Sequence, residues 1–574
     1  MTARRPARTG RTALLAASLL LGGCASGGPS MEALGPGGDA PWDLLLVNGR
    51  LVDGTGNAWR YADVAVSGDR VAAVLPPGTA DRARAREVLD VSGHVVAPGF
   101  IDLNGQGDTG LLRDGRALNK LYMGVTTEIM GESNTPAPLN DNVTGGDPAR
   151  DETEERRRRE WTRFGAWLEE MEAGGVSVNV ASFLGGTTVR RYAMGLREGT
   201  PSPAELDTML AVTARAMEDG ALGVATALIY PPGAYAGTEE LVHVAGEVAR
   251  HGGVYISHIR SESAGLLDAL GEAVEIGRRG RVPVEVYHLK AAGVDNWDLQ
   301  AEAIALIDRA RAGGVDIQAA MYPYTAASTS LQACLPPWTS ADGRLQDNLR
   351  DPAVRARIIR EMSAPPEGWE NWCALSTPEG AMMVGLSRRN RDLTGRTLAE
   401  LAEDRRVPWA EAVLDLLIDE GNVGMVYFAM AEENVRELLG QPWMKFGSDS
   451  GIQDPDNATG MTHPRGYGTY PRILGRYVRE EGVLPLEEAV RKMTSAVADR
   501  VGLQRRGLLR EGWFADVVVF NPAGISELAT FTEPHQLSRG VTHLLVNGEL
   551  VVRDGAFTGA SPGRFLRGPG ARGR

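Results

Sequence analysis

The feature that most limits how this chain can fold is a regular alternation of apolar runs and amphipathic segments through its middle. Strand-like apolar runs occur at 176–185, 221–227, 253–258, 282–288 and 315–324. The segments between them have helical periodicity, and we expect helices over about 203–219, 238–250, 264–279 and 298–312. Strands joined through helices run parallel, so the pattern predicts a closed parallel sheet, a TIM-type (β/α)8 barrel.

We assign residues 98–504 to this barrel. The alternation is lost over about 340–440, and we expect this part to form an insertion over the barrel mouth. In barrels of this class, functional side chains collect at the C-terminal ends of the strands. The chemistry of the chain is therefore expected at those ends.

The two ends of the folded body have a different pattern. Residues 43–74 and 543–557 consist of short apolar runs separated by NG and DG turns, and residues 512–522 have the same character. Such sequences form β-hairpins. We therefore predict one small β-sandwich assembled from residues 41–97 and 505–574, the latter including a tail. The fold class is α/β.

The N-terminus has the parts of a bacterial secretion signal. Several arginines precede an apolar stretch that is too short to span a bilayer and ends at Leu21-Gly22-Gly23-Cys24. This ending resembles a lipobox, so we expect a signal peptide over 1–23, lipidation of Cys24 and a flexible tether over 24–40. A plain signal peptide with a chance cysteine is the alternative. The lipobox interpretation predicts a lipid-anchored protein on the periplasmic or extracellular face of the bacterial cell envelope, meeting the membrane through the anchor only.

Charge restricts the partners of the chain. The formal net charge of the 574 residues is −14, and the pI is near 5.3. Nucleic-acid binding needs a basic field, so we expect no nucleic-acid partner.

Two cysteines remain in the predicted mature body besides Cys24. In an oxidising periplasm Cys334 and Cys373 would form one disulfide. Two cysteines in a large domain carry little information, so the default expectation is that they are structural or free, and the disulfide is the alternative.

Three strand-end residues have side chains that a divalent metal site needs. His258 ends GVYISH, His288 ends VPVEVYH, and Asp449 lies in FGSDSG. Imidazoles bind zinc, and a carboxylate can take a proton from water beside the metal. At each position a hydrogen-bonded structural residue is the alternative.

A series of motifs gives this pattern a family context. In chain order these motifs are PGFID (98–102), GVTT (124–127), DGALGVATALIYPPGAYAGTEEL (219–241), GGVYISHIRSE (252–262), VEVYHLKAAG (284–293), MYPYTAAST (321–329), FGSDSG (446–451), HPRGYGTYPRILGRYVRE (463–480) and RRGLLREGWFADVVVFNP (505–522). Together they resemble the D-aminoacylase family, the N-acyl-D-amino-acid deacylases of the amidohydrolase superfamily, over nearly the whole mature chain. The resemblance implies a β-sandwich, a metal-dependent barrel, and hydrolysis of the N-acyl amide bond.

The resemblance also implies roles for individual residues. His258 and His288 match the family's tighter metal site, and Asp449 matches the aspartate that takes a proton from water and delivers it to the leaving amine. The positions that match the family's binding site for the substrate's α-carboxylate are Lys290, Tyr322, Ser328 and Arg465. A cationic fork with a hydroxyl suits a carboxylate, although Lys290 and Arg465 would also serve as ordinary ion-pair partners.

The chain departs from the family at its other metal-binding positions. Asn104 and Gln106 replace an HxH pair, and Ser133 stands where the family usually has a metal-bridging cysteine. Gly186 stands where the family often has a histidine. Amides are poor zinc ligands beside imidazole. We therefore expect the second, weaker metal site to be absent, with Asn104 and Gln106 lining the former metal pocket and touching the substrate or the metal's water.

Without the cysteine, the two histidines need a third ligand. Glu132 lies at a strand end beside Ser133, and Glu128 lies within the same strand. Either glutamate would complete a zinc site of two histidines and one glutamate, and the strand-end position favours Glu132. Pairing of Glu132 with an arginine such as Arg260 is the alternative. We expect one zinc ion per chain.

The predicted function is metal-dependent hydrolysis of the N-acyl bond of an N-acyl-(D-)amino acid or a similar small amide with a free carboxylate. One alternative keeps the fold and the metal but changes the substrate to another C–N bond, such as that of a cyclic amide or a dipeptide, because barrel loops set specificity. Another is a lipid-anchored binding protein without catalysis. Loss of the HxH pair and the cysteine favours that alternative, whereas retention of His258, His288 and Asp449 opposes it.

Overall fold

The computed structural model describes residues 41–145, 151–365, 369–386 and 390–572. The expected signal peptide over 1–23, the lipidation site Cys24 and the tether over 24–40 lie outside these residues. Across the described ranges, no helix combines the length and the apolar character needed to cross a bilayer.

Parallel strands form a closed barrel in the middle of the chain. The barrel strands are β6 (Phe100–Asp102), β7 (Val125–Met130), β8 (Asn179–Ser182), β9 (Leu184–Gly185), β10 (Gly223–Ala227), β11 (Val254–His258), β12 (Val284–Val286), β13 (Ile317–Met321) and β17 (Met444–Phe446). β6 to β8 pair as one run, and β9 to β13 pair with β17 as another. Gly105 bridges Ser450 after β6 and β17, and Leu222 N donates to Ser182 O beside β10 and β8. These contacts close the ring and confirm the predicted TIM-type barrel.

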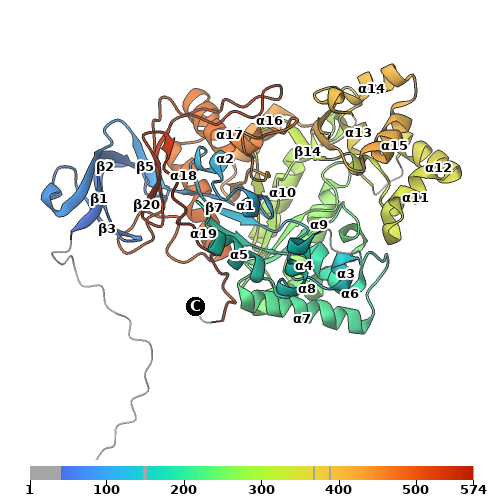
Figure 1. The fold of residues 1–574 in the computed structure, drawn as a ribbon, viewed down its shortest axis with the longest axis horizontal. Helices are drawn as coiled ribbons and strands as arrows, with labels where there is room; N and C mark the ends of the chain where they lie inside the picture. Colours follow the sequence, from blue (N-terminus) through green and yellow to red (C-terminus); the bar gives the residue numbers. More distant parts are fainter. Residues whose placement is uncertain (1–40, 146–150, 366–368, 387–389, 573–574) are drawn as a thin grey trace, which may run out of the picture. The chain divides into compact units, whose positions relative to one another are not determined.

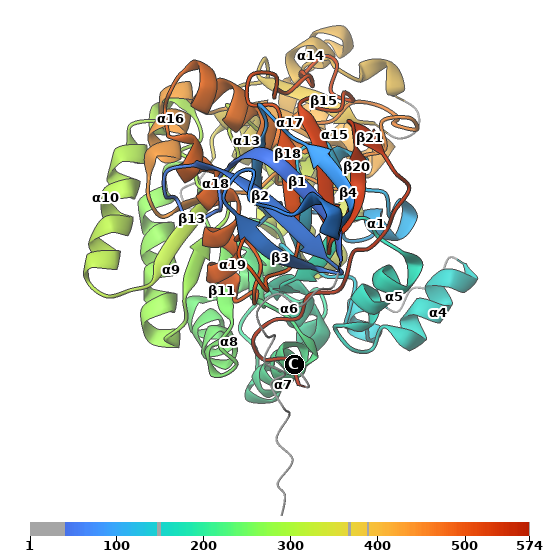
Figure 2. The same ribbon diagram turned by 90° about the vertical axis from the view of Figure 1, so that its left-hand side faces the viewer.

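Helices alternate with the barrel strands and cover them. The expected helices are α7 (Pro203–Asp219), α8 (Thr238–Arg250), α9 (Leu266–Gly280) and α10 (Leu299–Ala312), which follow one another around the barrel (Figure 2). α7 begins at a capping box of Ser202 and Glu205 and ends at Gly220 in the left-handed conformation. The remaining barrel-associated helices are α1 (Gly110–Arg113), α2 (Leu118–Leu121), α3 (Asp141–Thr144), α4 (Glu152–Glu160), α5 (Ala166–Gly174), α6 (Gly186–Met194), α17 (Arg465–Arg472), the π-helix Ile473–Glu480, α18 (Leu486–Met493) and α19 (Ser495–Val501).

Strands from both ends of the body share one sheet. These strands are β1 (Trp42–Leu51), β2 (Arg60–Ser67), β3 (Arg70–Leu75), β4 (Ala85–Asp90), β5 (Val95–Pro98), β18 (Val517–Phe520), β19 (Val541–Val546), β20 (Glu549–Arg553) and β21 (Ala556–Phe557). β5 pairs antiparallel with β18, so the blue and red ends of the chain lie side by side (Figures 1 and 2). Val64 of β2 and Val519 of β18 are not sheet neighbours, yet they share one buried cluster. The sheet therefore folds over its own core, as expected for the predicted sandwich.

An inserted layer lies between β13 and β17 in the sequence. It contains an antiparallel sheet of β14 (Ala326–Ser330), β16 (Gly424–Phe428) and β15 (Ala381–Gly385), and the helices α11 (Leu345–Arg350), α12 (Pro352–Ser363), α13 (Trp372–Leu375), α14 (Leu398–Arg405) and α15 (Trp409–Glu420) (Figure 1). This layer has its own buried core, and a disulfide joins Cys334 to Cys373 within it.

The bounds of the insertion differ from the expected 340–440. β14 starts at Ala326, whereas α16 (Glu432–Gly440) buries Val435 and Leu438 in the barrel core rather than in the inserted layer. The sequence did not reveal this because β14 is short and follows β13 without a helix.

The C-terminal tail leaves the sandwich and joins the barrel. Pro562 bridges Val176 and Phe565 bridges Val180, both in parallel orientation. The tail therefore extends the sheet beside β8, a contact that composition alone did not predict.

Candidate active site

Three side chains from separate strand ends converge at the barrel mouth. Glu132 follows β7, His258 ends β11, and His288 follows β12. Oε1 of Glu132 lies 3.2 Å from Nδ1 of His258 and 3.2 Å from Nε2 of His288. One ligand atom from each residue lies within 4.8 Å of the others. Among the predicted metal-binding residues, the structure thus brings Glu132, His258 and His288 together.

The donor set fits a zinc ion. Zinc ligands at about 2.0–2.1 Å in tetrahedral geometry are themselves about 3.3 Å apart, close to the separations of 3.2 Å found here. Nδ1 of His288 lies 2.9 Å from Oε1 of Glu262, which orients the ring so that Nε2 faces Glu132. A carboxylate behind a metal-ligating imidazole is the usual second contact in such sites.

Electrostatics at these residues also favour a cation. Burial opposes ionisation of Glu132, but the charges and hydrogen bonds of His288 and His258 outweigh it and hold the pKa of Glu132 well below its usual range. Burial and Lys290 disfavour protonation of His288, yet Glu262, Glu132 and Asp449 raise its pKa to about 9. Carboxylates thus surround the imidazoles, and a metal ion would satisfy them in place of protons.

The alternative third ligands lie elsewhere. Glu128 is fully buried beside Lys120, with its Oε1 3.5 Å from the Lys120 ammonium group. The hydroxyl of Ser133 lies 3.1 Å from that of Thr187. Arg260 pairs with Glu272 at 2.9 Å, so the expected alternative of an Arg260–Glu132 pair is wrong.

Asp449 is held through both of its carboxylate oxygens. Nε2 of Gln106 donates to Oδ1 at 2.6 Å. Nη1 of Arg465 lies 2.7 Å from Oδ2, an ion pair without the angle of a hydrogen bond. Burial raises the pKa of Asp449, and the positive charges of Arg465 and His288 offset this only in part. Asp449 and His288 have φ of 48° and 33°, an unusual left-handed backbone for these residue types that often marks functional sites.

The predicted carboxylate-binding residues surround Tyr322. The guanidinium of Arg465 lies 4.5 Å from the centre of the Tyr322 ring, and the ammonium of Lys290 lies 5.6 Å from it. Among the described residues, the buried Tyr322 hydroxyl has no hydrogen-bond partner. Ser328 accepts from Arg465 through its carbonyl, while its hydroxyl donates to Met425 O.

Lys290 has a second set of contacts. Its ammonium donates to Oε1 of Glu262 and lies 2.8 Å from Nδ1 of His288. The ion-pair alternative therefore describes Lys290 in this structure: Lys290 pairs with the carboxylate of Glu262, which in turn holds the imidazole of His288.

One cavity of about 390 Å³ connects these groups. Its lining includes Gln106, Glu132, His258, His288, Lys290, Tyr322, Ser328, Asp449 and Arg465. Asn104 differs from expectation, because its side chain is 2% exposed and packs under the site rather than lining the cavity. Its carbonyl accepts from Asp449 N at 2.8 Å, so Asn104 fixes the end of β17 through its backbone.

Sequence reasoning missed several residues of this cavity, among them Glu262 and Tyr230. Glu262 is nearly fully buried and contacts His288 and Lys290. Its signal was its place in HIRSE, four residues after His258, where the chain leaves the strand. Tyr230 lies with its ring 5.4 Å from that of His258, and its hydroxyl lies 2.6 Å from that of Thr329.

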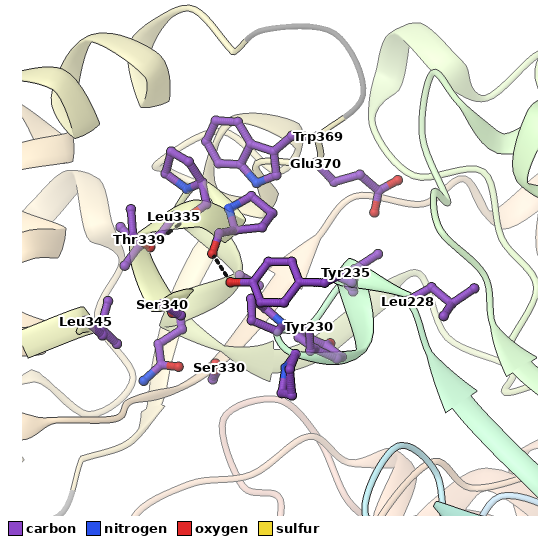
Figure 3. A pocket seen from close by; sticks show the side chains of 18 of the residues that line it. Leu228, Tyr230, Tyr235, Ser330, Leu335, Thr339, Ser340, Leu345, Trp369 and Glu370 are labelled. Atoms are coloured by element: carbon purple, nitrogen blue, oxygen red, sulfur yellow. Dashed lines mark hydrogen bonds between the residues drawn. The ribbon is translucent and has the colours of Figure 1, made fainter. Parts of the chain in front are cut away.

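A second cavity of about 350 Å³ shares Tyr230 with the first. Figure 3 shows the side chains that line this second cavity. Its lining mixes apolar side chains from the loop after β10 and from the inserted layer, among them Leu228, Leu335 and Trp369, with polar ones that include Arg260 and Glu370. The Tyr235 hydroxyl donates to Pro337 O at 3.0 Å and ties the two segments together (Figure 3).

Comparison with known proteins agrees with this geometry. The amidohydrolase family model matches residues 383–552. The D-aminoacylase of Alcaligenes xylosoxydans xylosoxydans is 35% identical over 536 residues, which are 92% of this chain and 98% of that protein. A D-aminoacylase structure with a binuclear metal centre, described by one-metal activation and second-metal attenuation, superposes with a TM-score of 0.75 at 35% identity, covering 92% of this chain and 100% of that one.

A further solved relative carries a bound metal. The N-acyl-D-glutamate deacylase of Bordetella bronchiseptica, solved with zinc and a phosphonate mimic of the tetrahedral intermediate, has a TM-score of 0.76 at 31% identity, with 92% of this chain and 100% of that chain covered. The predicted family is therefore confirmed: the chain belongs to the D-aminoacylase family of the amidohydrolase superfamily, hydrolases that act on C–N bonds other than peptide bonds.

Proposed function

We propose that this protein is a zinc-dependent deacylase that hydrolyses the N-acyl amide bond of an N-acyl-D-amino acid or a similar small amide with a free carboxylate. The observation that carries the proposal is the meeting of Glu132, His258 and His288 with Asp449 and Arg465 in one cavity. These side chains come from separate strand ends and supply a metal site, a proton carrier and a carboxylate partner.

Glu132, His258 and His288 would hold a single zinc ion. When bound, zinc supplies a Lewis acid that polarises the scissile carbonyl and lowers the pKa of water toward neutrality. Glu262 keeps the His288 ring in place behind this site, and Lys290 pairs with Glu262.

Asp449 carries the proton between water and the leaving group. Its carboxylate reaches the cavity beside Glu132 and His288, within range of a water molecule at the scissile bond. Burial favours its protonated form, so Asp449 can accept a proton from water and then deliver it to the departing amine.

Arg465 and Tyr322 receive the substrate carboxylate. Nη1 of Arg465 has no well-directed hydrogen bond, and the Tyr322 hydroxyl has no partner within the described ranges. A carboxylate placed between them would satisfy both buried donors.

A bulky group of the substrate extends past Tyr230. The second cavity shares Tyr230 with the cavity of the metal site, and apolar and polar side chains both line it. Its volume of about 350 Å³ exceeds the volume of a methyl group, which favours a substrate with a bulky side chain or a bulky acyl group.

We also place the protein in the bacterial cell envelope, anchored by a lipid on Cys24. The lipobox-like sequence supports this proposal, and so does the Cys334–Cys373 disulfide, since disulfides persist mainly in oxidising compartments. Expression of the full chain in a bacterium should place it in the membrane fraction, and Cys24→Ala should release it. Equal fractionation of the two chains would contradict the anchor.

A substrate panel tests the activity. The zinc-loaded enzyme should hydrolyse N-acyl-D-amino acids with bulky side chains faster than their L-enantiomers, matched carboxamides, dipeptides or cyclic amides. Preferred turnover of a cyclic amide would move the function to another C–N bond, and turnover of none of these compounds would contradict the proposal.

A further inference from the structure

Gln106 joins the two carboxylates that face each other across the site. Its Nε2 donates to Oδ1 of Asp449 at 2.6 Å and to Oε2 of Glu132 at 3.3 Å. The two amide hydrogens can thus serve one carboxylate each. The same Glu132 directs its other oxygen, Oε1, at the imidazoles of His258 and His288.

The backbone holds Gln106 in this position. Its N–H donates to Ser450 O at 3.1 Å, and the preceding Gly105 N–H donates to Ile129 O at 2.8 Å. The segment is thereby fixed to the ends of both β17 and β7. A Cβ on Gly105 would lie 2.3 Å from Cγ of Glu128, so the segment can approach β7 this closely only with glycine there.

The charges of Glu132 and Asp449 explain why a hydrogen-bond donor lies between their carboxylates. Asp449 is buried and the side chain of Glu132 is only 9% exposed, and like charges at short range destabilise each other. A second cation between them would relieve this repulsion, and so does an amide group that donates to both. The amide nitrogen is a donor and not a metal ligand, so its presence between the carboxylates excludes an ion from the same space.

We propose that Gln106 takes the place of a second metal ion in this enzyme. It is a positioning residue that fixes Asp449 beside the zinc site, and it restricts the chain to one zinc ion. The inference rests on the proposed function. It also separates this chain from the D-aminoacylase described with a binuclear centre, in which the second metal attenuates activity.

Zinc titration tests the restriction to one ion. Calorimetry and elemental analysis should give one zinc ion per wild-type chain, and no further zinc should bind in excess. The hydrolytic activity of the wild-type enzyme should not change as zinc is added beyond one ion per chain. The Asn104→His/Gln106→His variant should bind a second zinc ion, and its activity should fall as that ion binds. A second zinc in the wild-type chain, or no second zinc in the double variant, would overturn the role of Gln106. Absence of any zinc from the wild-type chain would instead overturn the proposed function.

A single substitution tests the positioning role. Gln106→Leu keeps a similar volume but removes both donors, so kcat should fall by about tenfold to a hundredfold. KM should change by less than about threefold, because the carboxylate-binding residues are untouched. The melting temperature shows that the variant is folded. An unchanged kcat, or a loss confined to KM, would overturn the positioning role.

Discussion

At the scale of single residues, the site depends on carboxylates that are buried beside histidines. Glu262 illustrates this, because it contacts both His288 and Lys290 and lies almost entirely out of solvent. Burial raises the pKa of such a group, but the positive charges of Lys290, His258 and His288 outweigh burial and hold the pKa of Glu262 well below its usual range, so Glu262 stays ionised throughout the neutral range. Glu262 is thus a fixed negative charge behind the metal site.

Replacing Glu262 tests this charge. In Glu262→Gln the side chain keeps its shape, but the His288 ring loses its ionised acceptor, so zinc affinity should fall by about tenfold to a hundredfold. Competition with a chelator measures this affinity. Glu172→Gln, an exposed change on α5, is the control. Equal zinc affinity in the two variants would show that Glu262 does not support the site.

Arg465 should determine whether a substrate carboxylate is recognised. In Arg465→Gln, kcat/KM for an N-acyl amino acid should fall by about tenfold to a hundredfold. This is the loss expected when hydrogen bonds to a charged group are removed. The matched carboxamide, which lacks the charge, should lose much less. Steady-state kinetics on the pair gives the ratio, and equal losses on both compounds would contradict the carboxylate role.

The sequence predicted which strand-end residues meet at the site better than it predicted the hydrogen bonds that hold them. His258, His288 and Glu132 end or follow strands, and the parallel order of those strands brings them together. The bonds from Gln106 to Asp449 and Glu132 depend on side-chain directions after β6, which residue spacing does not fix. Asn104 was expected to line the cavity, but close packing against Gly447 turns it under the site.

At the scale of elements, the inserted layer supplies one wall of the site. Trp372 of α13 lines the cavity, and the neighbouring Cys373 is joined to Cys334 across 39 residues of sequence. The disulfide therefore holds that wall to the segment that follows β14. The sequence predicted that this layer exists but not where it ends. The periodicity of α16 shows only that it is a helix with an apolar face, and the structure shows that this face packs against the barrel rather than the inserted layer.

Removing the disulfide should loosen this wall. Cys334→Ala/Cys373→Ala should lower the free energy of unfolding by up to about 4 kcal/mol, the loop-closure value for a loop of this length. KM should rise as Trp372 becomes less fixed, while zinc content stays unchanged. Calorimetric melting with and without reductant measures the stability change. Identical melting of the wild type and the double variant would contradict the prediction.

At the scale of the whole molecule, the alternation of strands and helices was enough to predict the barrel, and the hairpin-like ends were enough to predict the shared sandwich. The tail at Pro562 and Phe565 was not predictable, because its bridges to Val176 and Val180 are backbone contacts without a sequence pattern. Folding of the body therefore depends on contacts between segments from both ends of the chain.

The stability of the metal-free protein should depend on pH through Glu128. Burial raises the pKa of Glu128 to about 7, although Lys120 partly offsets it, and the usual value is 4.5. The fold thus favours the protonated acid. The stabilisation of the fold by protonated Glu128 is complete below about pH 4.5 and is lost as the pH rises through about 7.

Denaturation in urea between pH 5 and pH 8 tests whether the free energy of unfolding falls as the pH rises. The wild type should lose up to about 3 kcal/mol over this range relative to Glu128→Gln, whose amide does not titrate. If the free energy of unfolding changed with pH in the same way in both proteins, Glu128 would not be the source of the pH dependence.

The central claim is that Glu132 completes a zinc site with His258 and His288, and the zinc content of the purified protein tests it most directly. Elemental analysis should find about one zinc per wild-type chain, little in Glu132→Gln, and a full complement in the exposed control Glu172→Gln. Absence of zinc from the wild type after loading, or full retention of zinc by Glu132→Gln, would contradict the account.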